Sequence, residues 1–503
     1  MIVNNPIMWI DMPDPDLIRV GDTYYMVSTT MFVMPGGPIL KSKDLYHWEL
    51  VSYIFITIED NEIYRLENGK HAYGKGQWAT SLKYHNGMFY ACFVCHDLQK
   101  TFIYYTEDIE KSGWERYVIN DVFHDMSFLF DDDGRAYLIY GNGDIRIVEL
   151  NENISGLKKG GISQLLFSTP TEDIGLRCEG CRAYKLNGYY YLLFIEWPRN
   201  GNARRRQVCY RSKSLLGEYE RKIILDDDMG YQNNGIAQGA LIDTVDSKWY
   251  TMLFQDHGAV GRIPYLLPAT WENGWPVIGI DGKVPKSFEV PFEEYIVNPL
   301  IISDSFYHTV NIMDSRWEWN HNPDDSCWSF TDNPGYLRLY AKYADKLLSA
   351  RNTLTQRTSG PTCEVIVTLS THGMKPGDFA GLVALQGNFG AIGVKVLDKG
   401  ERKLVSSRRI DGGDQKDYIV NDLKEDDIRL KIAFDFIDSK DIAAFYYYDT
   451  EQARWLEVQD RLKMKYTLDL FIGYRVGLFC YSDKEDSGFA DFTDFQYLPG
   501  IEL

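Results

Sequence analysis

The sequence predicts an all-β protein in which a five-bladed β-propeller is followed by a β-sandwich. Three observations support this prediction. The first 290 residues contain five copies of one hairpin pattern and lack any long helical periodicity, and the rest of the chain contains seven or more short strand patterns separated by polar turns. Aromatic residues make up 14% of the 503 residues, which also favours strands because aromatic side chains pack well on pleated sheets.

Each copy of the hairpin pattern has an apolar strand, a tight polar turn and a second strand led by aromatic residues. Asn-Gly and Asp-Gly between apolar runs are the strongest short hairpin signals. The predicted hairpins are Leu17 to Ser28, Ser81 to Phe93, Ser127 to Tyr140, Arg182 to Phe194 and Ala240 to Phe254. Their turns recur at intervals of 47 to 66 residues, and each interval has room for about four strands, as in a propeller blade. The alternative, a pair of sandwiches, would not require five copies of one hairpin.

A second region of strands begins after Pro291 and Pro299 interrupt the pattern. The predicted strands are Tyr336 to Tyr340, Cys363 to Leu369, Phe379 to Leu385, Ala391 to Leu397, Ile428 to Phe436, Ile442 to Tyr448 and Arg475 to Phe479. Seven or more strands with polar turns over this length indicate a sandwich. We therefore expect a propeller over residues 1–290, a linker over 291–304 and a sandwich over 305–503.

The formal net charge is −19, which argues against nucleic-acid binding because that function needs basic patches to neutralise phosphates. The segment Met1-Ile-Val-Asn-Asn-Pro6 lacks the basic start and the apolar run of a signal peptide. No stretch approaches the ~20 apolar residues of a membrane helix. We expect a cytoplasmic protein with no membrane partner, and the sequence leaves the oligomeric state open, including a homo-oligomer.

Eight cysteines in a chain of this length do not indicate a disulfide framework. Two Cys-x-x-Cys pairs, Cys92/Cys95 and Cys178/Cys181, have a spacing that zinc sites use. In a strand, however, residues i and i+3 face opposite sides of the sheet. We therefore expect buried free thiols and no metal site.

Three acidic residues occupy equivalent places in three of the five repeats. Asp14 lies seven positions before the turn glycine of its repeat, and Asp125 and Glu179 each lie nine positions before theirs. Because the innermost strands of propeller blades converge on the axis, we expect the three side chains to meet at one end of the channel. Asp14 also lies between Pro13 and Pro15, and proline favours extended geometry in the residue before it, so we expect a constrained, extended backbone there.

Converging carboxyl groups suit the hydrolysis of glycosidic bonds. The leaving oxygen must receive a proton while a nucleophile attacks the anomeric carbon, and two carboxyl groups in different protonation states can perform both tasks. A third carboxylate near the acid raises the pKa of the acid by like-charge repulsion, which keeps it protonated near neutral pH. The three acids therefore indicate a base, an acid and a group that tunes the acid.

Further motifs lie in chain order across both predicted domains. They are Asn5-Pro6, Asp11-Met-Pro-Asp14-Pro, Gly74-Lys-Gly-Gln-Trp78-Ala, His124-Asp125-Met-Ser-Phe128, Phe130-Asp-Asp-Asp-Gly134, Glu179-Gly-Cys-Arg-Ala-Tyr184-Lys, Val260-Gly-Arg262, Trp317-Glu-Trp-Asn-His-Asn322-Pro and Ser349-Ala-Arg-Asn-Thr-Leu-Thr-Gln-Arg357. In the first half, these motifs resemble glycoside hydrolase family 43, the five-bladed propeller family of β-xylosidases, α-L-arabinofuranosidases and arabinanases. In the second half, they resemble the concanavalin-like or lectin-like sandwich that accompanies its xylosidases and arabinofuranosidases.

This resemblance implies an inverting reaction with three acidic groups. Asp14 would be the general base that activates water, Asp125 would tune the pKa of the acid and orient the site, and Glu179 would be the general acid. The resemblance also implies that Arg262 contacts substrate hydroxyls, the alternative being a surface ion pair. Trp78 would form an aromatic wall of the sugar pocket, the alternative being a core tryptophan.

Two phenylalanines are weaker candidates for substrate contacts. Phe32 follows the first hairpin and is expected either at the sugar pocket or in the core. In such enzymes the sandwich can push a loop against the propeller mouth and close one side of it. We expect the loop Lys484-Glu-Asp-Ser-Gly488 to do this, with Phe489 as the contact, and a solvent-exposed loop is the alternative.

The chain departs from the family pattern at two places. Many relatives place a histidine on the channel axis, often near a bound calcium, where this chain has Ala237 in the segment Gly235-Ile-Ala-Gln-Gly239. We expect that no cofactor is required, and the substitution puts a structural calcium in doubt. The motif of the acid reads Glu179-Gly-Cys-Arg182 where Glu-Ala/Gly-Pro-His is common, so the residues beside the acid, and with them subsite specificity, are expected to differ.

We interpret the chain as an inverting exo-glycoside hydrolase that releases terminal β-D-xylose, α-L-arabinofuranose or both from xylo- or arabinoxylo-oligosaccharides. The expected closed mouth favours removal of single terminal sugars. One alternative is an endo-arabinanase, which would need an open groove. The other is a non-catalytic carbohydrate-binding propeller, which would need no base, tuner and acid.

Overall fold

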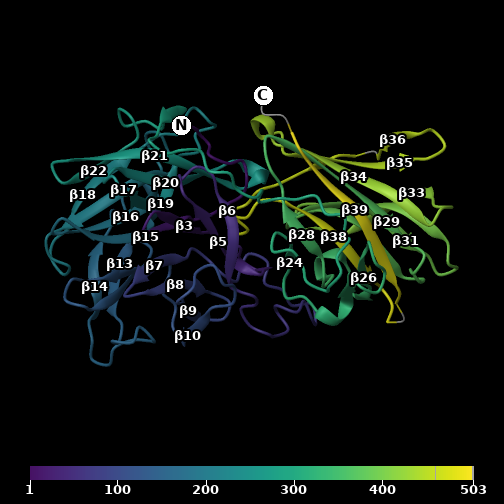
Figure 1. The fold of residues 1–503 in the computed structure, drawn as a ribbon, viewed down its shortest axis with the longest axis horizontal. Coiled ribbons are helices and arrows are strands. Elements are labelled where there is room, and N and C mark those ends of the chain that lie inside the picture. The colour runs from purple at the N-terminus through teal and green to yellow at the C-terminus, as the bar shows by residue number, and fades with distance from the viewer. Residues whose placement is uncertain (459, 486, 501–503) are drawn as a thin grey trace.

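The computed structural model describes residues 1–458, 460–485 and 487–500, and it has two β-rich domains side by side (Figure 1). The propeller, coloured purple to teal, lies on the left of the figure, and the sandwich, coloured green to yellow, lies on the right. The predicted all-β fold, a five-bladed propeller followed by a sandwich, is confirmed.

Within the described residues, the propeller has five four-stranded antiparallel sheets, and in each the strands follow one another in chain order. The first strands of neighbouring blades contact one another around a closed ring, so these strands line the axis. The strands of successive blades are β2 (Asp16–Val20), β3 (Thr23–Val27), β5 (Gly36–Ser42) and β6 (Glu49–Phe55); β7 (Ser81–His85), β8 (Met88–Cys95), β9 (Lys100–Thr106) and β10 (Glu115–Ile119); β11 (Ser127–Phe130), β12 (Ala136–Tyr140), β13 (Asp144–Glu149) and β14 (Ser163–Ser168); β15 (Ile174–Leu186), β16 (Tyr189–Pro198), β17 (Arg206–Ser212) and β18 (Glu220–Leu225); and β19 (Ala237–Asp243), β20 (Trp249–Asp256), β21 (Arg262–Glu272) and β22 (Trp275–Ile278).

The five predicted hairpins are the first two strands of the five blades, so these predictions are confirmed. The turn chemistry explains why. Asn86 and Gly87 have φ of 50° and 83°, and Asn187 and Gly188 have φ of 50° and 77°. Positive φ at both central residues is the mirror-image turn whose twist matches two antiparallel strands, and asparagine followed by glycine adopts it most readily.

Adjacent blades pack face to face through buried apolar side chains. Between blades two and three, for example, Val94 and Phe128 belong to one fully buried cluster. A similar cluster joins blade five to blade one and closes the ring. The closure is reinforced where β1 (Ile2–Asn4) pairs with β23 (Ser287–Glu289). The Asn5 side chain also donates a 2.8 Å hydrogen bond to the backbone oxygen of Leu266 and accepts a 3.0 Å bond from its N–H.

The sandwich consists of two sheets, which have nine and eight strands among the described residues. The first sheet contains β33 (Lys416–Asp422), β32 (Arg402–Arg409), β31 (Phe389–Val396), β30 (Asp378–Leu385), β38 (Arg475–Ser482), β28 (Leu354–Arg357), β24 (Glu318–Asn320) and β4 (Val33–Met34), with β27 (Lys342–Tyr343) beside β38. The second sheet contains β25 (Trp328–Ser329), β26 (Leu337–Tyr340), β39 (Phe489–Pro499), β29 (Thr362–Ser370), β34 (Asp427–Asp435), β35 (Ile442–Asp449) and β36 (Arg454–Glu457), with β37 (Leu462–Lys463) beside β35. The helices are short 3₁₀ turns: η1 (Gly258–Val260), η2 (Asp325–Cys327), η3 (Leu347–Ser349) and η4 (Ile437–Ser439).

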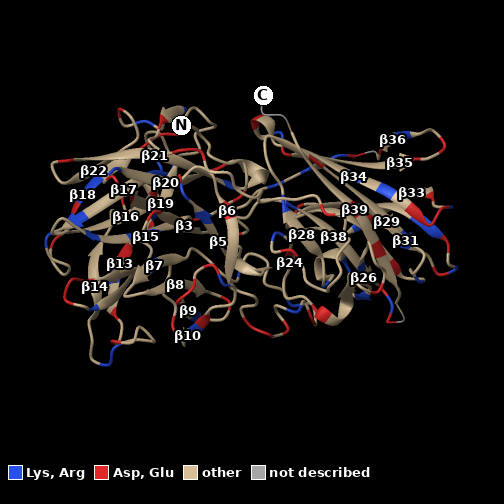
Figure 2. Cartoon of the chain, viewed as in Figure 1, with Lys and Arg blue, Asp and Glu red and all other residues tan. Residues whose placement is uncertain are grey.

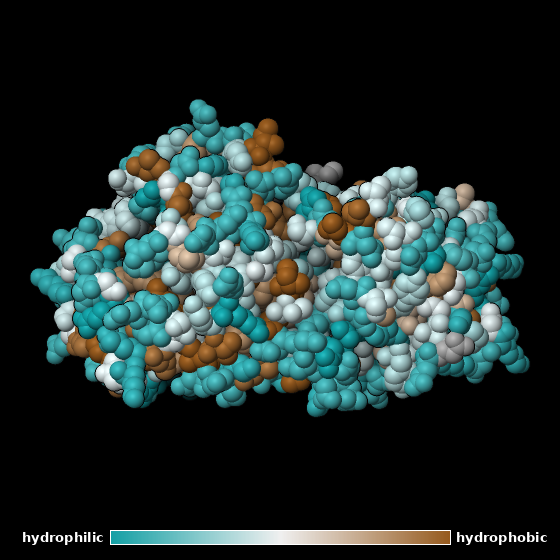
Figure 3. All heavy atoms as spheres, turned by 60° about the horizontal axis from the view of Figure 1, so that its bottom comes forward, coloured by the Kyte–Doolittle hydropathy of each residue, from teal (hydrophilic) through white to brown (hydrophobic). Residues whose placement is uncertain are grey.

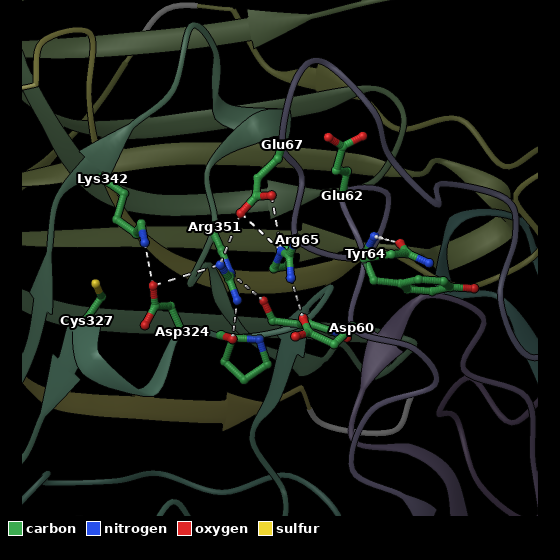
Figure 4. A network of polar contacts seen from close by, with 12 residues as sticks. Asp60, Glu62, Tyr64, Arg65, Glu67, Asp324, Cys327, Lys342 and Arg351 are labelled. Atoms are coloured by element: carbon green, nitrogen blue, oxygen red, sulfur yellow. Dashed lines mark hydrogen bonds and ion pairs between the residues drawn. The ribbon is translucent and has the colours of Figure 1, made fainter.

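The two domains share one sheet, because β4 comes from the loop between strands of blade one and pairs with β24 of the sandwich. Next to this junction, the segment 59–72 between blades one and two faces the sandwich through the charged network in Figure 4. Arg351 of the sandwich lies 3.8 Å from Glu67 and 3.9 Å from Asp324, and Arg65 and Lys342 extend the network at its two ends. These groups are partly exposed, so each pair contributes at most about 1 kcal/mol.

A second set of charges is buried beside this junction, on the sandwich strands β24, β28 and β38. Glu318 in β24 lies 3.2 Å from Arg357 and also pairs with Arg475, and all three side chains are buried. One carboxylate thus pairs with two guanidinium groups beside the junction of the domains. Buried charges of this kind are costly to separate, because the partner that remains keeps its charge without its solvent.

The surface carries both signs of charge. In Figure 2, acidic and basic residues are interspersed along the strands and loops of both domains. In Figure 3, hydrophilic residues cover most of the face shown. Among the described residues, no helix has the length and apolar character that a membrane crossing requires.

We predict that Glu318→Gln lowers the free energy of unfolding by about 3–5 kcal/mol, because it leaves two buried guanidinium groups without their counter-charge. Lys342→Met, which breaks an ion pair of the exposed network, is the matched control and should cost about 1 kcal/mol or less. Thermal and denaturant unfolding of both variants measures the difference. Equal losses in the two variants would contradict the larger contribution assigned to the buried group.

Candidate active site

A cavity of about 640 Å³ lies at the end of the propeller channel where the first strands of the blades begin. It receives side chains from blades one to five and from the sandwich. The lining residues are Asp14, Trp78, Ala79, His124, Asp125, Gly175, Leu176, Glu179, Trp197, Pro198, Arg199, Ala203, Arg205, Gln238, Arg262, Leu468 and Phe471. The three acids singled out from the sequence, together with Trp78 and Arg262, therefore lie around one cavity.

Asp14 is almost fully buried and is held at both carboxylate oxygens. Its Oδ1 accepts a 2.7 Å hydrogen bond from Arg262, and its Oδ2 accepts a 2.8 Å bond from the hydroxyl of Thr29. Burial raises the pKa of Asp14, and the negative charge of Asp125 raises it further. The positive charge of Arg262 acts in the opposite direction and lowers this pKa. The expectation of an extended backbone is wrong, because Asp14 has φ of +55°, a strained conformation that is common at functional sites.

Asp125 also has a left-handed backbone, with φ of +48°, just before β11. Its Oδ2 accepts a 2.9 Å hydrogen bond from the backbone N–H of Gly180, directly after Glu179. Asp125 thus fixes the strand that carries the candidate acid. Burial raises the pKa of Asp125, and the neighbouring His124 works in the opposite direction.

Glu179 lies inside β15 and not before it, because this strand is long and irregular. Its pairing with β16 shifts register on both sides of Glu179, and Gly180 has φ of +68°. A Cβ on Gly180 would lie 2.7 Å from the side chain of Gln238, so glycine is required at this bulge. The bulge directs the Glu179 side chain to the cavity, where it is 21% exposed.

Arg262 connects the candidate base to the rest of the site. Besides Asp14, its guanidinium contacts Asp256 at 3.2 Å and the hydroxyl of Tyr466 at 3.1 Å. It lies between the rings of Phe254 and Phe471, at 4.5 and 4.3 Å from their centres. Within the described residues, no protein acceptor is recorded for its Nη2, so this nitrogen is available to a ligand in the cavity.

The sandwich closes one side of the cavity with residues 466–473, between β37 and β38. Leu468 and Phe471 line the cavity, and the Phe471 ring lies edge-on to Trp78 at 5.3 Å. This segment is held by Asp11, whose buried carboxylate accepts hydrogen bonds from the backbone N–H groups of Arg262 at 2.7 Å and Gly473 at 2.8 Å. Burial raises the pKa of Asp11 to about 6.

The prediction that the loop Lys484-Glu-Asp-Ser-Gly488 closes the cavity through Phe489 is wrong. Phe489 begins β39, where its ring lies 3.6 Å from the Arg338 guanidinium and packs against His372 and Tyr340. These contacts are inside the sandwich, so Phe489 does not line the cavity. Within the proposed loop, Asp486 lies outside the described residues. The signal that could have identified the correct segment is the apolar run from Leu470 to Ile472 between two predicted strands, because such a run needs a partner to cover it.

Phe32 also lies away from the cavity. It is buried between Tyr73 and His321, with ring centres 4.8 and 4.7 Å away, at the junction of propeller and sandwich. Trp78, in contrast, forms part of the cavity wall and also packs against His96 at 4.7 Å. Of the four predicted substrate contacts, the structure therefore brings Trp78 and Arg262 to the cavity and places Phe32 and Phe489 elsewhere.

The residues on the axis do not fit a bound calcium. Ala237 is fully buried and has no ligand atom in its side chain. The buried Arg182 guanidinium lies 3.3 Å from Asp16 and donates a 2.9 Å hydrogen bond to the backbone oxygen of Asp14. Lys83 is 3.9 Å from the same carboxylate, so two cations already share it and would repel a divalent ion. Arg182, the departure in the motif of the acid, therefore supports the backbone of the candidate base and does not form part of the cavity wall.

Among the described residues, one group could bring three ligand atoms to a metal ion: His124, Asp125 and Glu179, whose ligand atoms lie within 4.8 Å of one another. The same atoms contact each other, since Nε2 of His124 is 3.2 Å from Glu179 and 3.9 Å from Asp125. The Asp125 carboxylate raises the pKa of His124 to about 9, so the imidazole is protonated at neutral pH and carries a positive charge between the two carboxyl groups. We interpret the group as an ion-paired cluster. The cysteines of the two Cys-x-x-Cys pairs are buried free thiols.

Several residues that sequence analysis did not single out lie at or just after the end of the second strand of a blade. His96 follows β8, Asn142 follows β12, Trp197 lies near the end of β16 and Asp256 ends β20. The first strand of each blade begins at the cavity, and an antiparallel partner must end there. A polar or aromatic residue at the end of the second strand of each blade could therefore have identified these residues from the sequence.

Comparison with known proteins agrees with this geometry. The model of glycosyl hydrolases family 43 matches residues 3–276, and the model of the β-xylosidase C-terminal concanavalin A-like domain matches residues 303–498. A β-xylosidase of Formosa agariphila is 30% identical over 98% of this chain and 90% of its own length. A non-reducing end α-L-arabinofuranosidase of Bacteroides ovatus is 29% identical over 67% of this chain and 64% of its own length.

Among solved structures, a bifunctional GH43-CE protein of Bacteroides eggerthii is 40% identical, with a TM-score of 0.92 over 99% of this chain. The present chain spans 64% of the length of that protein. A propeller whose blades bring carboxyl groups to one cavity, extended by this sandwich, defines the class: the protein is a glycoside hydrolase. The chain belongs to glycosyl hydrolase family 43.

We predict that the ion pair between Arg262 and Asp14 sets the acid limb of the pH profile. A base must be ionised, so activity should fall as the pH drops through the pKa of Asp14. Arg262→Met removes the charge that opposes the rise of this pKa, so the acid limb of kcat/KM should move to higher pH, by about 1–3 units.

Arg262→Lys, which keeps the positive charge, serves as the matched variant and should move the limb less. Unfolding curves at the same pH values separate an effect on Asp14 from a loss of folded protein. An acid limb that stays in place in a folded Arg262→Met variant would contradict Asp14 as the group that must be ionised.

Proposed function

We propose that this protein is an inverting exo-glycoside hydrolase that releases terminal β-D-xylose, α-L-arabinofuranose or both from xylo- or arabinoxylo-oligosaccharides. The observation that carries the proposal is the single cavity to which three blades contribute Asp14, Asp125 and Glu179 and to which the sandwich contributes Leu468 and Phe471. The names of the relatives, a β-xylosidase and an α-L-arabinofuranosidase, support the choice of pentose substrates.

In this proposal, Asp14 is the general base. Its two oxygens accept hydrogen bonds from Arg262 and Thr29, so its orientation is fixed before substrate enters. A water molecule that gives its proton to Asp14 attacks the anomeric carbon of the terminal sugar, and its oxygen becomes the new hydroxyl of that carbon. Burial favours proton uptake by Asp14, which makes it a stronger base.

Glu179 is the general acid on the other side of the scissile bond. It gives its proton to the glycosidic oxygen as the bond to the anomeric carbon breaks, so the remaining sugar chain leaves as an alcohol. Asp125 orients this acid, because its hydrogen bond to the Gly180 backbone holds the strand that carries Glu179. These steps use carboxyl groups only.

The walls of the cavity support attack on a chain end. The extended strands of blade four contribute Leu176 and Trp197, and the sandwich segment contributes Leu468 and Phe471. In this proposal, walls from two domains around the acids limit the cavity to the end of a sugar chain. An endo-arabinanase would need a groove that passes through the mouth, and a carbohydrate-binding propeller would need no ionised base opposite an acid.

The proposal is tested by incubating the protein with aryl β-D-xyloside and aryl α-L-arabinofuranoside, and separately with linear arabinan. We expect turnover of at least one aryl glycoside and release of single sugars from the chain ends of oligosaccharides. Asp14→Asn should abolish this turnover. Glu218→Ala, which changes an exposed carboxylate on blade four, is the matched control and should leave it unchanged.

Two outcomes would contradict the proposal. Arabinan cut first into internal fragments would favour the endo-arabinanase. Binding of oligosaccharides without turnover of any glycoside would favour the carbohydrate-binding propeller. The ratio of kcat/KM for the two aryl glycosides decides between xylose and arabinose as the preferred sugar.

A further inference from the structure

The carboxyl group of Glu179 is held asymmetrically. Its Oε2 accepts two hydrogen bonds, one from Nε2 of His124 at 3.2 Å and one from Nδ2 of Asn142 at 2.5 Å. Within the described residues, no donor is recorded for Oε1. Because Glu179 lines the cavity, the two oxygens have different environments: one faces fixed protein donors and the other is free to meet a ligand.

Asn142 is placed by a tight turn with glycine on both sides. The turn lies between β12 and β13, and Gly141 has φ of +127° while Gly143 has φ of +75°. The N–H of Gly141 bonds the backbone oxygen of His124 at 2.9 Å, and the N–H of Gly143 bonds that of Cys178 at 2.8 Å. The turn is therefore attached both to the segment of His124 and to the strand that carries Glu179. A Cβ on Gly143 would lie 2.3 Å from the Arg177 side chain, so the turn requires glycine there.

His124 is oriented from its other side. Its Nδ1 lies 3.1 Å from Nε2 of His96, and its ring packs edge-on to Trp78 at 6.0 Å. The titratable groups that face His124 are Asp125, Glu179 and His96. The charge of Asp97 in turn acts to raise the pKa of His96. Burial and the charge of His124 both lower the pKa of His96, whereas Asp125 raises that of His124. His96 is therefore the acceptor of the pair, and both ring nitrogens of His124 donate.

We propose that His124 and Asn142 are positioning residues of the hydrolytic reaction, which occupy Oε2 of Glu179 and so make Oε1 the oxygen that carries and delivers the proton. This inference rests on the proposed function of the site. In a protonated carboxyl group, the carbonyl oxygen accepts hydrogen bonds and the hydroxyl oxygen donates one. The hydroxyl oxygen is the weaker acceptor, so a proton on Oε2 would weaken both bonds, and the proton therefore favours Oε1.

The same contacts act on the acid after it has given its proton. When the Oε1 proton moves to the glycosidic oxygen and the bond to the anomeric carbon breaks, the negative charge of the carboxylate spreads to Oε2. There the two donors stabilise it, since hydrogen bonds to ionised groups are the stronger ones. His124 and Asn142 therefore stabilise the carboxylate that the reaction leaves on Glu179.

The test compares Asn142→Ala, His124→Ala and His124→Gln with the wild type on two substrates, xylobiose and an aryl xyloside with an activated leaving group; if the wild type prefers arabinose, an arabino-oligosaccharide and an activated aryl arabinofuranoside take their places. Xylobiose needs full proton donation and the activated substrate does not. We expect both alanine variants to lose about 10- to 100-fold in kcat on xylobiose, with KM changed by less than about threefold, and to lose little on the activated substrate. Glu179→Ala, which removes the acid itself, should show the largest difference in kcat loss between the two substrates.

The pH profile supplies a second readout. Removing a donor or a positive charge beside the ionised acid should move the alkaline limb of kcat/KM to higher pH. His124→Gln keeps an N–H donor but not the charge, so it should recover part of the rate on xylobiose while its alkaline limb remains displaced. Asn120→Ala, an exposed asparagine near blade three, is the control and should match the wild type.

Equal losses on both substrates, or alkaline limbs that stay at the wild-type pH, would show that the two residues only maintain the fold and would overturn the inference. This result is distinct from failure of the proposed function. If the proposed function is wrong, the wild-type protein itself turns over no glycoside; if only the inference is wrong, the wild type is active and the variants show no dependence on the leaving group.

Discussion

The site depends on one buried cation, the guanidinium of Arg262. It contacts the candidate base Asp14 at 2.7 Å and Asp256 of the same blade at 3.2 Å, and it lies between two aromatic rings. Burial raises the pKa of Asp256, but Arg205 and Arg262 together lower it. Without this cation, two buried carboxylates would face each other with less compensation, which is costly in a protein interior. Arg262 thus favours the ionised form of Asp14, which the proposed mechanism requires of its base.

The sandwich is part of the site and not only an attached domain. Phe471 packs on the face of Arg262, and the hydroxyl of Tyr466 bonds the same guanidinium. Asp11 accepts N–H groups from a propeller strand and from the sandwich segment that covers the cavity. The shared sheet of β4 and β24 fixes the two domains beside one another. For these reasons, substitutions at the domain junction should alter the cavity even where the substituted residue does not contact a substrate.

Local sequence patterns predicted the five-bladed fold and the convergence of the three acids. They did not predict contacts between residues that lie far apart in the chain. Asn-Gly turns such as Asn86-Gly87 mark a hairpin within a few residues, and the repeat of the hairpin defines the ring. Asp14 and Asp125 precede innermost strands and Glu179 lies within one, so their convergence followed from the repeat. The covering segment was missed because only the packing of two domains places Phe471 over Trp78. The left-handed backbone of Asp14 was missed because tertiary bonds from Arg182 and Thr29 override the preference that Pro15 imposes.

The proposed mechanism requires a base and an acid on opposite faces of the scissile bond, with a water molecule between the base and the anomeric carbon. Proton NMR of the first sugar released from an aryl β-D-xyloside, recorded before the free sugar equilibrates, tests this requirement most directly. A single displacement by water predicts that α-D-xylose appears first and that the β-anomer grows in later. Initial release of β-D-xylose would mean two displacements through a covalent intermediate and would contradict the role of Asp14 as the base that activates water.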